Sequence, residues 1–307
     1  MLQKIVIAGG AGTLGRAVAS HFADLGHEVV ILTRSIKANH THRQLLWNGR
    51  DVEASWGAEL AGSILVNLAG ELVDRPATEN NIELLKTSRT EPTAALAKAS
   101  SRFGRPALWL QMSTLAIYGD AGDTILTEAS RLADGPRQMT EVAKAWEAAA
   151  PAGSAERMVY LRTAIVLQPN SPALNRLITI TRWFLGGTVA SGRQWVSWVH
   201  IHDFLRALDF IIANASLEGV VHITAPEPLM NRAMMTALRQ QLGRPPSPAT
   251  PAWAIKLGSR LIFRTDAGLA LTGRRALPSR LEALGFSFEF ETFAAALADL
   301  LASSRRN

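Results

Sequence analysis

The stretch KIVIAGGAGTLG, residues 4–15, decides the fold of this chain. Its first half contains the apolar run Ile5-Val6-Ile7, which predicts a short strand buried on both faces. Apolar residues then recur at helical spacing over residues 14–25, and Gly26 marks the end of that helix. The stretch therefore predicts a strand, a glycine-rich turn and a helix in immediate succession.

The glycine-rich turn favours a dinucleotide site. Gly9, Gly12 and Gly15 let the backbone bend sharply and let a ligand and the next strand come close. A helix N-terminus also offers unpaired N–H groups and a partial positive charge, which suit a pyrophosphate. A second apolar strand over residues 28–32 supplies the context that such a motif requires. The alternative is a tight strand–helix turn that binds nothing.

The end of the second strand indicates which dinucleotide binds. An acid there accepts a hydrogen bond from the ribose 2′-hydroxyl of NAD, whereas an arginine suits the 2′-phosphate of NADP. This chain has Thr33-Arg34-Ser35 and no acid at that point. We therefore expect these residues to contact the cofactor, and NADP(H) to bind in preference to NAD(H). The alternative is that Arg34 is a solvated loop residue.

The composition limits the class of protein. The 307 residues allow one large or two small domains. There is no cysteine, which excludes disulfides, thiolate catalysis and zinc sites built on cysteine. No apolar run approaches the ~20 residues of a membrane span, and the first strand begins too early for a signal peptide. These features predict a cytoplasmic protein with no membrane partner.

The formal net charge of +6 is unevenly distributed. Between residues 231 and 280 the basic residues face a single acid, Asp266. Such a region attracts an anionic substrate, a nucleic acid or an acidic partner, or it is simply a solvated surface. No nucleic-acid reading motif accompanies the arginines, so we expect no nucleic-acid partner. The basic residues are Arg232, Arg239, Arg244, Lys256, Arg260, Arg264, Arg274, Arg275 and Arg280.

Strands and helices alternate through the first half of the chain. Strands are expected at 63–70, 107–112 and 158–162, and helices at 79–102 and 139–150. This alternation predicts an α/β fold with a Rossmann-type, doubly wound parallel sheet. In the second half, helices are expected at 174–184, 203–213, 252–263 and 292–301.

These patterns predict two domains. We expect residues 1–167 to form an NADP(H)-binding Rossmann domain, with residues 195–225 returning to it. Residues 168–307 are expected to form a smaller substrate-binding domain. Nothing in the sequence identifies an oligomer interface.

Small and polar residues follow two of the expected strands. One ends in Asn67-Leu68-Ala69-Gly70, and another continues into Ser113-Thr114. Open α/β sheets bind ligands outside the carboxyl ends of their strands. We therefore expect residues 67–70 to pass under the cofactor, unless they are a plain strand-to-loop transition. The two hydroxyls are placed to hydrogen-bond a substrate carbonyl or alcohol.

Neither of the two histidine pairs predicts a metal site. His40 and His42 lie in residues 40–56, a polar and irregular stretch expected to be a surface loop, and no third ligand is near. His200 and His202 alternate along an extended segment, so they face opposite ways. We expect no metal.

Several motifs, spread along the chain, match one known family. They are Gly9-x-x-Gly12-x-x-Gly15, residues 67–70, Ser113…Tyr118-Gly119, Leu161-Arg162-Thr163 and residues 192–201. With them, the chain resembles the NAD-dependent epimerase/dehydratase group of the extended short-chain dehydrogenases/reductases. More narrowly, it is similar to the atypical "epimerase family protein" or SulA-type cell-division inhibitor subgroup. That subgroup ends in a small domain of unknown function, whose hallmarks match residues 274–278 and 284–286.

The resemblance implies an N-terminal NADP(H) domain and a smaller substrate domain. It places Arg162 near the nicotinamide side, and Arg193 and Trp195 in the substrate pocket. We add His200 to the substrate site because the pKa of histidine suits proton transfer. The cofactor contacts carried over by position are Gly9, Gly12, Thr13, Leu14, Gly15, Arg34, Leu68, Ala69 and Gly70, and Asn67 is expected beside them.

The chain departs from the wider family at its acid/base pair. That family uses a tyrosine and, four residues later, a lysine that lowers the tyrosine pKa. Counted back from Glu147, these positions hold Met139 and Ala143. Lys144 is one place off, which turns it roughly 100° around the helix. The atypical subgroup also lacks the pair.

Other side chains are candidates to replace that pair. Ser113 and Thr114 occupy the hydroxyl position of the family, and which of them matches depends on a one-residue choice. Tyr118 is expected to be a core residue. Asp203 fits an N-cap of the following helix as well as it fits a catalytic role.

Two functions of different classes follow. The first is an NADP(H)-dependent oxidoreductase or epimerase that acts on a small anionic molecule, with Ser113 or Thr114 binding the reacting oxygen. The second is a binding protein that holds NADP(H) as a sensor or regulator without turnover. A nucleic-acid role is third and would require strongly salt-dependent binding.

Overall fold

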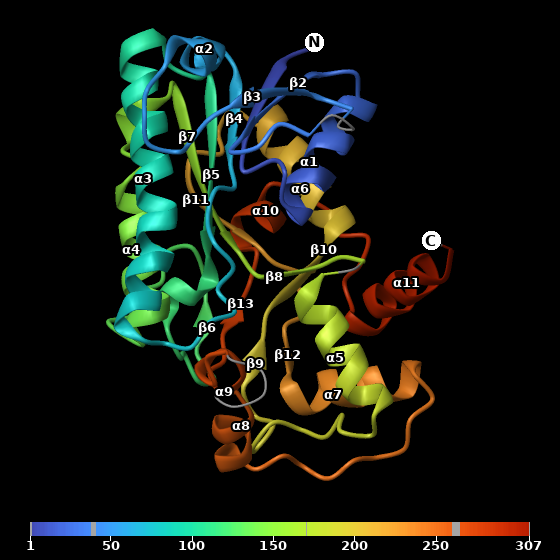
Figure 1. The fold of residues 1–307 in the computed structure, drawn as a ribbon. Helices are drawn as coiled ribbons and strands as arrows, with labels where there is room; N and C mark the ends of the chain where they lie inside the picture. The colour runs from blue at the N-terminus through green and yellow to red at the C-terminus, as the bar shows by residue number, and fades with distance from the viewer. Residues whose placement is uncertain (1, 38–40, 170, 260–264, 307) are drawn as a thin grey trace.

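The computed structural model describes residues 2–37, 41–169, 171–259 and 265–306. Its centre is a seven-stranded sheet in which every pair of neighbours is parallel, as predicted for a Rossmann-type α/β fold. The chain extends the sheet one way from β1 to β3 and the other way from β4, so the order reverses between β1 and β4. Across the sheet (Figure 1), the strands are β11 (Gly219–Ile223), β7 (Arg157–Thr163), β5 (Leu108–Thr114), β4 (Ile64–Asn67), β1 (Lys4–Ala8), β2 (Glu28–Thr33) and β3 (Arg43–Leu46).

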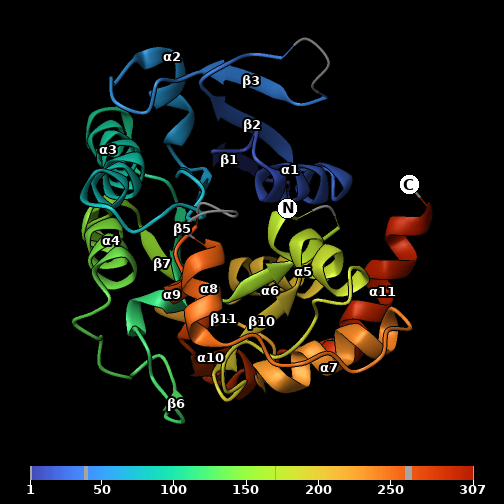
Figure 2. The same ribbon diagram turned by 60° about the horizontal axis from the view of Figure 1, so that its bottom comes forward.

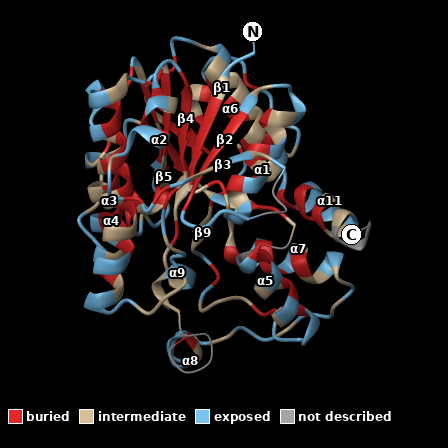
Figure 3. Ribbon diagram, turned by 45° about the horizontal axis from the view of Figure 1, so that its top comes forward, coloured by how far each residue is buried: buried red, intermediate tan, exposed pale blue. Residues whose placement is uncertain are grey.

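Helices cover both faces of the sheet. Strand β1 is buried from both sides because Ile5 and Ile7 belong to one apolar cluster and Val6 to the other. Figure 3 shows the outcome, with buried strands and exposed outer helix surfaces. One face carries α1 (Thr13–Asp24) and α6 (Ile201–Ala213), and the other carries α2 (Ala54–Gly57), α3 (Glu79–Phe103) and α4 (Arg137–Ala148) (Figure 1).

Residues 40–56 are not the plain surface loop that their polarity predicts. Residues 43–46 form β3, which pairs in parallel with β2, and residues 54–57 form α2. Strand β3 is the last strand of the sheet and its residues are partly or fully exposed, so it forms without an apolar run. His40 lies outside the described residues.

The chain leaves the sheet after β7 and returns to it at β11. On the way, β8 pairs in parallel with β10, and α6 then leads back to β11, which pairs with β7. Residues 201–223 therefore belong to the sheet layer. The elements outside the sheet on this path are β8 (Ile165–Leu167), α5 (Pro172–Arg182), β9 (Trp195–Val196) and β10 (Trp198–His200).

A smaller unit lies at the carboxyl ends of the strands (Figures 1 and 2). Its core includes Trp198, Met235 and Phe293, and the Trp198 indole N–H donates to the Glu227 carbonyl at 3.1 Å. Strand β13 pairs in parallel with β6, which ties the end of the chain to the loop after β5. The remaining elements are η1 (Ala58–Leu60), η2 (Leu115–Tyr118), β6 (Ile125–Leu126), η3 (Ala152–Ser154), β12 (Leu229–Met230), α7 (Asn231–Gln241), α8 (Ala252–Gly258), α9 (Gly268–Leu271), β13 (Arg275–Ala276), α10 (Ser279–Ala283) and α11 (Phe293–Arg306).

Within the described ranges, no helix combines the length and the apolar character that a membrane span requires.

Candidate functional site

The glycine-rich turn after β1 contacts the loop after β4. Gly9 has φ +80°, and a Cβ on it would lie 2.9 Å from backbone atoms of Leu68 and Ala69. A Cβ on Gly15 would lie 2.6 Å from the Cα of Gly10. Only glycine permits this close approach. The structure thus brings residues 9–15 and residues 68–70 together where the strand order reverses, as the sequence led us to expect for a dinucleotide site.

The N-terminus of α1 is open to a ligand. Gly12 is its N-cap and has no side chain to accept from the first amides. The first backbone bond back to the cap comes from the Arg16 N–H at 2.9 Å, so the amides of Thr13, Leu14 and Gly15 lack a partner in the described residues. Unpaired amides of this kind, at the positive end of a helix, suit a phosphate.

Arg16 adds a charge that the sequence reasoning missed. Its Nη1 donates to the Ala11 carbonyl at 2.6 Å, so the guanidinium folds back onto the glycine-rich turn. The signal was available, because a cation one residue after Gly15 lies in the first turn of the helix. The positive potential of the helix N-terminus is reinforced there.

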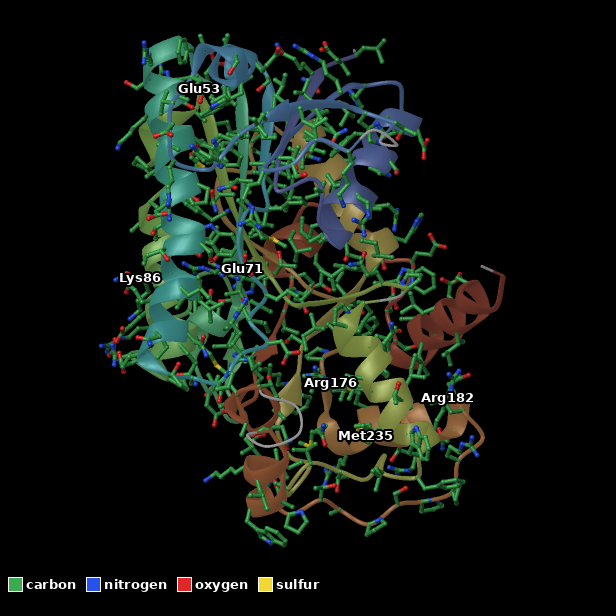
Figure 4. All side chains as sticks on the ribbon, in the orientation of Figure 1. Glu53, Glu71, Lys86, Arg176, Arg182 and Met235 are labelled. Carbon is green, nitrogen blue, oxygen red and sulfur yellow. The ribbon has the colours of Figure 1, made fainter. Side chains whose placement is uncertain are left out.

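Arg34 lies between the end of β2 and the loop after β4. Its side chain is 80% exposed, and its Nη2 lies 3.6 Å from Oε1 of Glu71. Thr33 and Ser35 bond to each other, with the Ser35 N–H donating to the Thr33 hydroxyl at 3.3 Å. Figure 4 labels Glu71 on its loop. The structure therefore leaves the Arg34 guanidinium loosely held and accessible.

Asn67 shapes the loop from within. It is fully buried; its Nδ2 donates to Thr93 Oγ1 and Gln111 Oε1, both at 2.9 Å, and its Oδ1 accepts from the Ala69 N–H at 3.1 Å. The side chain therefore positions residues 68–70 but has no exposed surface of its own. Its role is to hold the loop against the glycine-rich turn.

A buried arginine, also missed in the sequence, supports the same loop. Arg89 on α3 donates through Nη2 to the Glu71 carbonyl at 2.8 Å and lies over the Trp146 ring at 5.0 Å. A Cβ on Gly70 would lie 3.1 Å from this side chain. Burial lowers the pKa of Arg89 to about 10, so it remains charged at neutral pH.

The hydroxyls at the end of β5 differ in their partners. Ser113 is buried and its Oγ donates to Glu147 Oε1 at 2.5 Å. Thr114 is half-buried and its Oγ1 accepts from the Ala116 N–H at 3.1 Å. The Ser113 hydrogen is therefore committed to a carboxylate, whereas the Thr114 hydroxyl hydrogen is free to be donated to a ligand oxygen.

Arg162 is also tied to Glu147. Its Nε donates to Oε1 at 2.9 Å and its Nη2 to Oε2 at 2.8 Å, a bidentate pair with little exposure. The third donor, Nη1, reaches the Tyr118 hydroxyl at 2.8 Å. The structure thus places Arg162 beside Ser113, inside the protein, with its donors directed at these two side chains.

Tyr118 continues the chain of contacts to His222. The Tyr118 hydroxyl lies 2.7 Å from His222 Nε2, and His222 Nδ1 lies 3.0 Å from the Leu277 carbonyl. Because the carbonyl only accepts, Nδ1 carries the hydrogen and Nε2 accepts from the tyrosine. Burial lowers the pKa of His222 and raises the pKa of Tyr118. Tyr118 is a core residue, as expected, and its hydroxyl hydrogen-bonds to both Arg162 and His222.

These five side chains form what we call the buried polar network. They come from β5, η2, α4, β7 and β11, and each is hydrogen-bonded to at least one of the others. The members are Ser113, Tyr118, Glu147, Arg162 and His222.

The predicted acid/base positions lie next to the network on α4. Met139 and Ala143 are buried, and Met139 Sδ is 2.8 Å from Arg274 Nη2. Lys144 turns to the surface, where its Nζ lies 3.1 Å from Asp134 Oδ1. Neither of the two counted positions therefore carries a side chain that transfers a proton.

Arg193 and Trp195 share one partner. The Trp195 indole N–H donates to Asp123 Oδ1 at 2.7 Å, and Arg193 Nη2 lies 3.8 Å from Asp123 Oδ2. Arg275 lies over the Trp195 ring at 4.3 Å. The structure brings these predicted substrate residues together near the loop that follows η2.

His200, the third predicted substrate residue, faces the C-terminal segment instead of Arg193 and Trp195. Its Nδ1 accepts from the His202 N–H at 3.1 Å, its Nε2 lies 3.3 Å from Asp299 Oδ2, and its ring stacks on Phe290 at 3.9 Å. His200 is thus the N-cap of α6, and of the two roles left open for Asp203 the N-cap is excluded. Asp203 instead accepts from the Phe290 N–H at 2.9 Å, because it faces the loop before α11.

The basic C-terminal region is in part structural. Arg280 Nη1 donates to the Glu218 and Val220 carbonyls at 2.6 Å, so its charge faces the backbone. Arg260 and Arg264 lie outside the described residues. Among the described residues, no cluster of three or more His, Cys, Asp or Glu side chains has the arrangement of a metal site.

Comparison with known proteins adds to this geometry. Residues 5–223 match the model of the NAD dependent epimerase/dehydratase family, and residues 250–300 match a domain of unknown function, DUF1731. The epimerase family protein ML0860 of Mycobacterium leprae is 32% identical over 296 residues, which cover 95% of this chain and 94% of that protein. Mouse epimerase family protein SDR39U1 is 30% identical over 306 residues, or 98% of this chain and 100% of that protein. The crystal structure of human SDR39U1 (isoform 2) with NADPH superposes with a TM-score of 0.85 at 27% identity, covering 97% and 99% of the two chains.

Proposed function

The chain belongs to the NAD dependent epimerase/dehydratase family, and from that premise we propose that it is an NADP(H)-dependent oxidoreductase or epimerase acting on a small anionic substrate. The observation that carries the proposal is the open N-terminus of α1 beside the loop after β4. Amides of residues 13–15 and the Arg16 charge fit a pyrophosphate, and the glycine contact fits a dinucleotide that crosses from one loop to the other.

The preference for NADP(H) rests on Arg34. Its guanidinium is exposed and held by one long contact to Glu71, so it is free to take a 2′-phosphate in a charge-assisted bond. The human relative was crystallised with NADPH, which supports the same choice. A carboxylate at the end of β2, which would favour the 2′-hydroxyl of NAD, is absent from residues 33–35.

The chemistry divides between cofactor and protein. A bound nicotinamide supplies or takes the hydride. Thr114 donates its free hydroxyl hydrogen to the reacting oxygen of the substrate, and Ser113, whose hydrogen faces Glu147, is able only to accept from a substrate hydroxyl. Of the two hydroxyls, Thr114 is therefore our choice for a carbonyl substrate, and Arg193 with Trp195 lines its approach.

The second candidate is a binding protein that holds NADP(H) without turnover. Met139 and Ala143, at the positions counted for the acid/base pair, favour it because neither transfers a proton. Membership of the SulA-type cell-division subgroup and a cytoplasmic location also stay predictions. Turnover decides between the candidates.

The first experiment titrates the purified chain with NADPH and NADH by fluorescence. Arg34→Ala is expected to weaken NADPH binding by about 10-fold and to leave NADH binding unchanged, because one charge-assisted contact to the 2′-phosphate is lost. Arg50→Ala, which removes another largely exposed arginine, paired with Glu91, is the matched control. Tighter binding of NADH than of NADPH would contradict the cofactor assignment.

A panel of carbonyl and sugar-nucleotide compounds is then added to the NADPH complex. Oxidation of NADPH that disappears in the Ser113→Ala/Thr114→Ala double variant identifies an enzyme. Tight NADPH binding with no oxidation and no epimerisation across the panel identifies the sensor.

A further inference from the structure

The position predicted for the family's tyrosine is covered by an arginine from the far end of the chain. Arg274 precedes β13, and its Nη2 donates to Met139 Sδ at 2.8 Å and to Thr272 Oγ1 at 3.0 Å. Its Nε donates to the Gly119 carbonyl at 2.8 Å. The guanidinium thus stands between the end of η2 and the start of α4, where the tyrosine side chain of a typical family member would begin.

Backbone contacts fix Arg274 at this place. Its N–H donates to the Trp195 carbonyl at 2.9 Å, and the preceding Gly273 N–H donates to Asp120 Oδ1 at 2.9 Å. Gly273 leaves no room for a side chain, since a Cβ would lie 2.5 Å from the Trp195 nitrogen. The segment that holds Arg274, just before β13, is therefore fixed between the Trp195 segment and the loop after η2.

One end of the guanidinium remains available. Within the described part of the chain, Nη1 makes no hydrogen bond, and it is not one of the fully buried unpaired atoms. The other two nitrogens are engaged with neutral acceptors, and none of the ion pairs found in the described residues includes Arg274. Burial lowers the pKa of Arg274 to about 10, so a positive charge stands at the site at neutral pH.

The Arg274 guanidinium is a half-buried cation whose hydrogen-bond partners are neutral and whose Nη1 has no hydrogen-bond partner among the described residues. This arrangement suits the binding of an anion. Buried charges in proteins are normally paired, because an unpaired charge loses its hydration without compensation. The neutral acceptors here orient the guanidinium, and the nearby Asp120 carboxylate, which raises the pKa of Arg274, forms no hydrogen bond or ion pair with it among the described residues. An incoming oxyanion would both pair the charge and use Nη1.

From these contacts we infer that Arg274 binds the anionic group of the substrate, a carboxylate or phosphate oxygen, through Nη1 beside the start of α4. The inference rests on the proposed function and names the cation of that site. It assigns to the C-terminal segment a direct part in substrate binding. Arg274 would then place the substrate at the edge from which the typical acid/base side chain is missing.

The test measures anion binding directly. Pyruvate is the carboxylate probe and inorganic phosphate the phosphate probe, each titrated by calorimetry into the full chain with and without NADP+. At least one probe is expected to bind the wild type, and Arg274→Gln is expected to weaken that binding by at least about 10-fold. The probe whose binding depends on Arg274 tells which anion the site takes.

Two further variants separate binding from folding. Arg274→Lys keeps the charge and is expected to retain part of the anion affinity. If Arg274 were purely structural, Arg274→Lys and Arg274→Gln would lower the thermal unfolding temperature alike and neither would selectively weaken binding of the probes. Arg102→Gln removes an exposed arginine in the last turn of α3 and is expected to bind the probes like the wild type.

The outcomes distinguish this inference from the cofactor proposal. Arg274 variants should bind NADPH within about 2-fold of the wild type, because the pyrophosphate site lies on α1. Equal probe binding by wild type and Arg274→Gln, or no probe binding by the wild type, would overturn the inference. Arg274-dependent probe binding in a protein that fails to bind NADPH would instead defeat the proposed function and leave the anion site standing.

Discussion

Two regions at the same edge of the sheet are built in opposite ways. The glycine-rich turn and the open end of α1 are made from backbone, and their essential feature is the absence of side chains at Gly9 and Gly15. The buried polar network on β5, η2, α4, β7 and β11 is made from side chains, and its essential feature is that its donors have acceptors inside the protein. The first region is open to a ligand, whereas the second is closed on itself.

The difference separates binding from stability. A backbone site with unpaired amides gains its partner only from the ligand, so damage to it should appear in cofactor affinity. A closed network contributes to the folded state, so damage to it should appear in the free energy of unfolding. The three variants below test this separation.

The largest effect is expected inside the network. Glu147→Ala leaves Arg162 buried with its charge unpaired, which should cost about 3–5 kcal/mol of unfolding free energy. Urea denaturation measures this cost, and NADPH affinity should change little. Glu141→Ala, which breaks an exposed pair with Arg137 on the same helix, is the control and should leave the unfolding free energy nearly unchanged. A Glu147→Ala protein as stable as the control would mean that the network is not closed.

A smaller stability effect, with a larger effect on binding, is expected at the turn. Gly15→Ala places a Cβ 2.6 Å from the Cα of Gly10, so the turn must shift. The shift should lower the free energy of unfolding by about 1–3 kcal/mol. The shift displaces the amides of α1, and NADPH affinity measured by fluorescence should fall at least about 10-fold. Gly153→Ala has no heavy atom within 4 Å of its Cβ and serves as the control. Unchanged NADPH affinity in Gly15→Ala would refute the dinucleotide assignment.

The smallest effect is a pH dependence that belongs to the network. Burial lowers the pKa of His222 below its ordinary 6.5, so the unfolded chain takes up the proton more readily. Stability is then complete above about pH 6.5 and falls as the pH decreases toward the folded pKa, by up to about 1.4 kcal/mol per pH unit for one histidine. Urea unfolding between pH 5 and 7.5 should show a shallower slope for His222→Gln. In the His222→Gln variant, His200 should still contribute to the pH dependence of stability, because burial lowers its pKa as well.

The same contrast explains what the sequence revealed. Residues 4–15 encode strand, turn and helix in one short stretch, so their local fold was predictable. Strand β3 was missed because an edge strand with exposed residues lacks an apolar pattern. The role of Asp203 stayed open between an N-cap and catalysis because local spacing does not show that this carboxylate faces residues 289 and 290.

The network was predictable only in pieces. Ser113 and Arg162 were each singled out, and Glu147 served as a marker for counting, but nothing local joins them. Their contacts link residues 15 and 34 positions apart along the chain, and the Tyr118–His222 contact links residues 104 apart. Periodicity reports which face of an element is buried, and not which side chains meet across strands. Arg274 depends on still longer separations, since its contacts with Met139 and Gly119 span 135 and 155 positions.

The pairing of β13 with β6 bears on how this architecture is inherited. The two matched segments, residues 5–223 and residues 250–300, look like separable modules, yet Arg274 from the second occupies a space between elements of the first. A recombination point between the segments would still separate Arg274 from the residues of the first segment that it contacts, Gly119 and Met139. We therefore expect the C-terminal module to diverge together with its own sheet, so that chimaeras exchanging it between relatives fold but lose the substrate specificity of both parents.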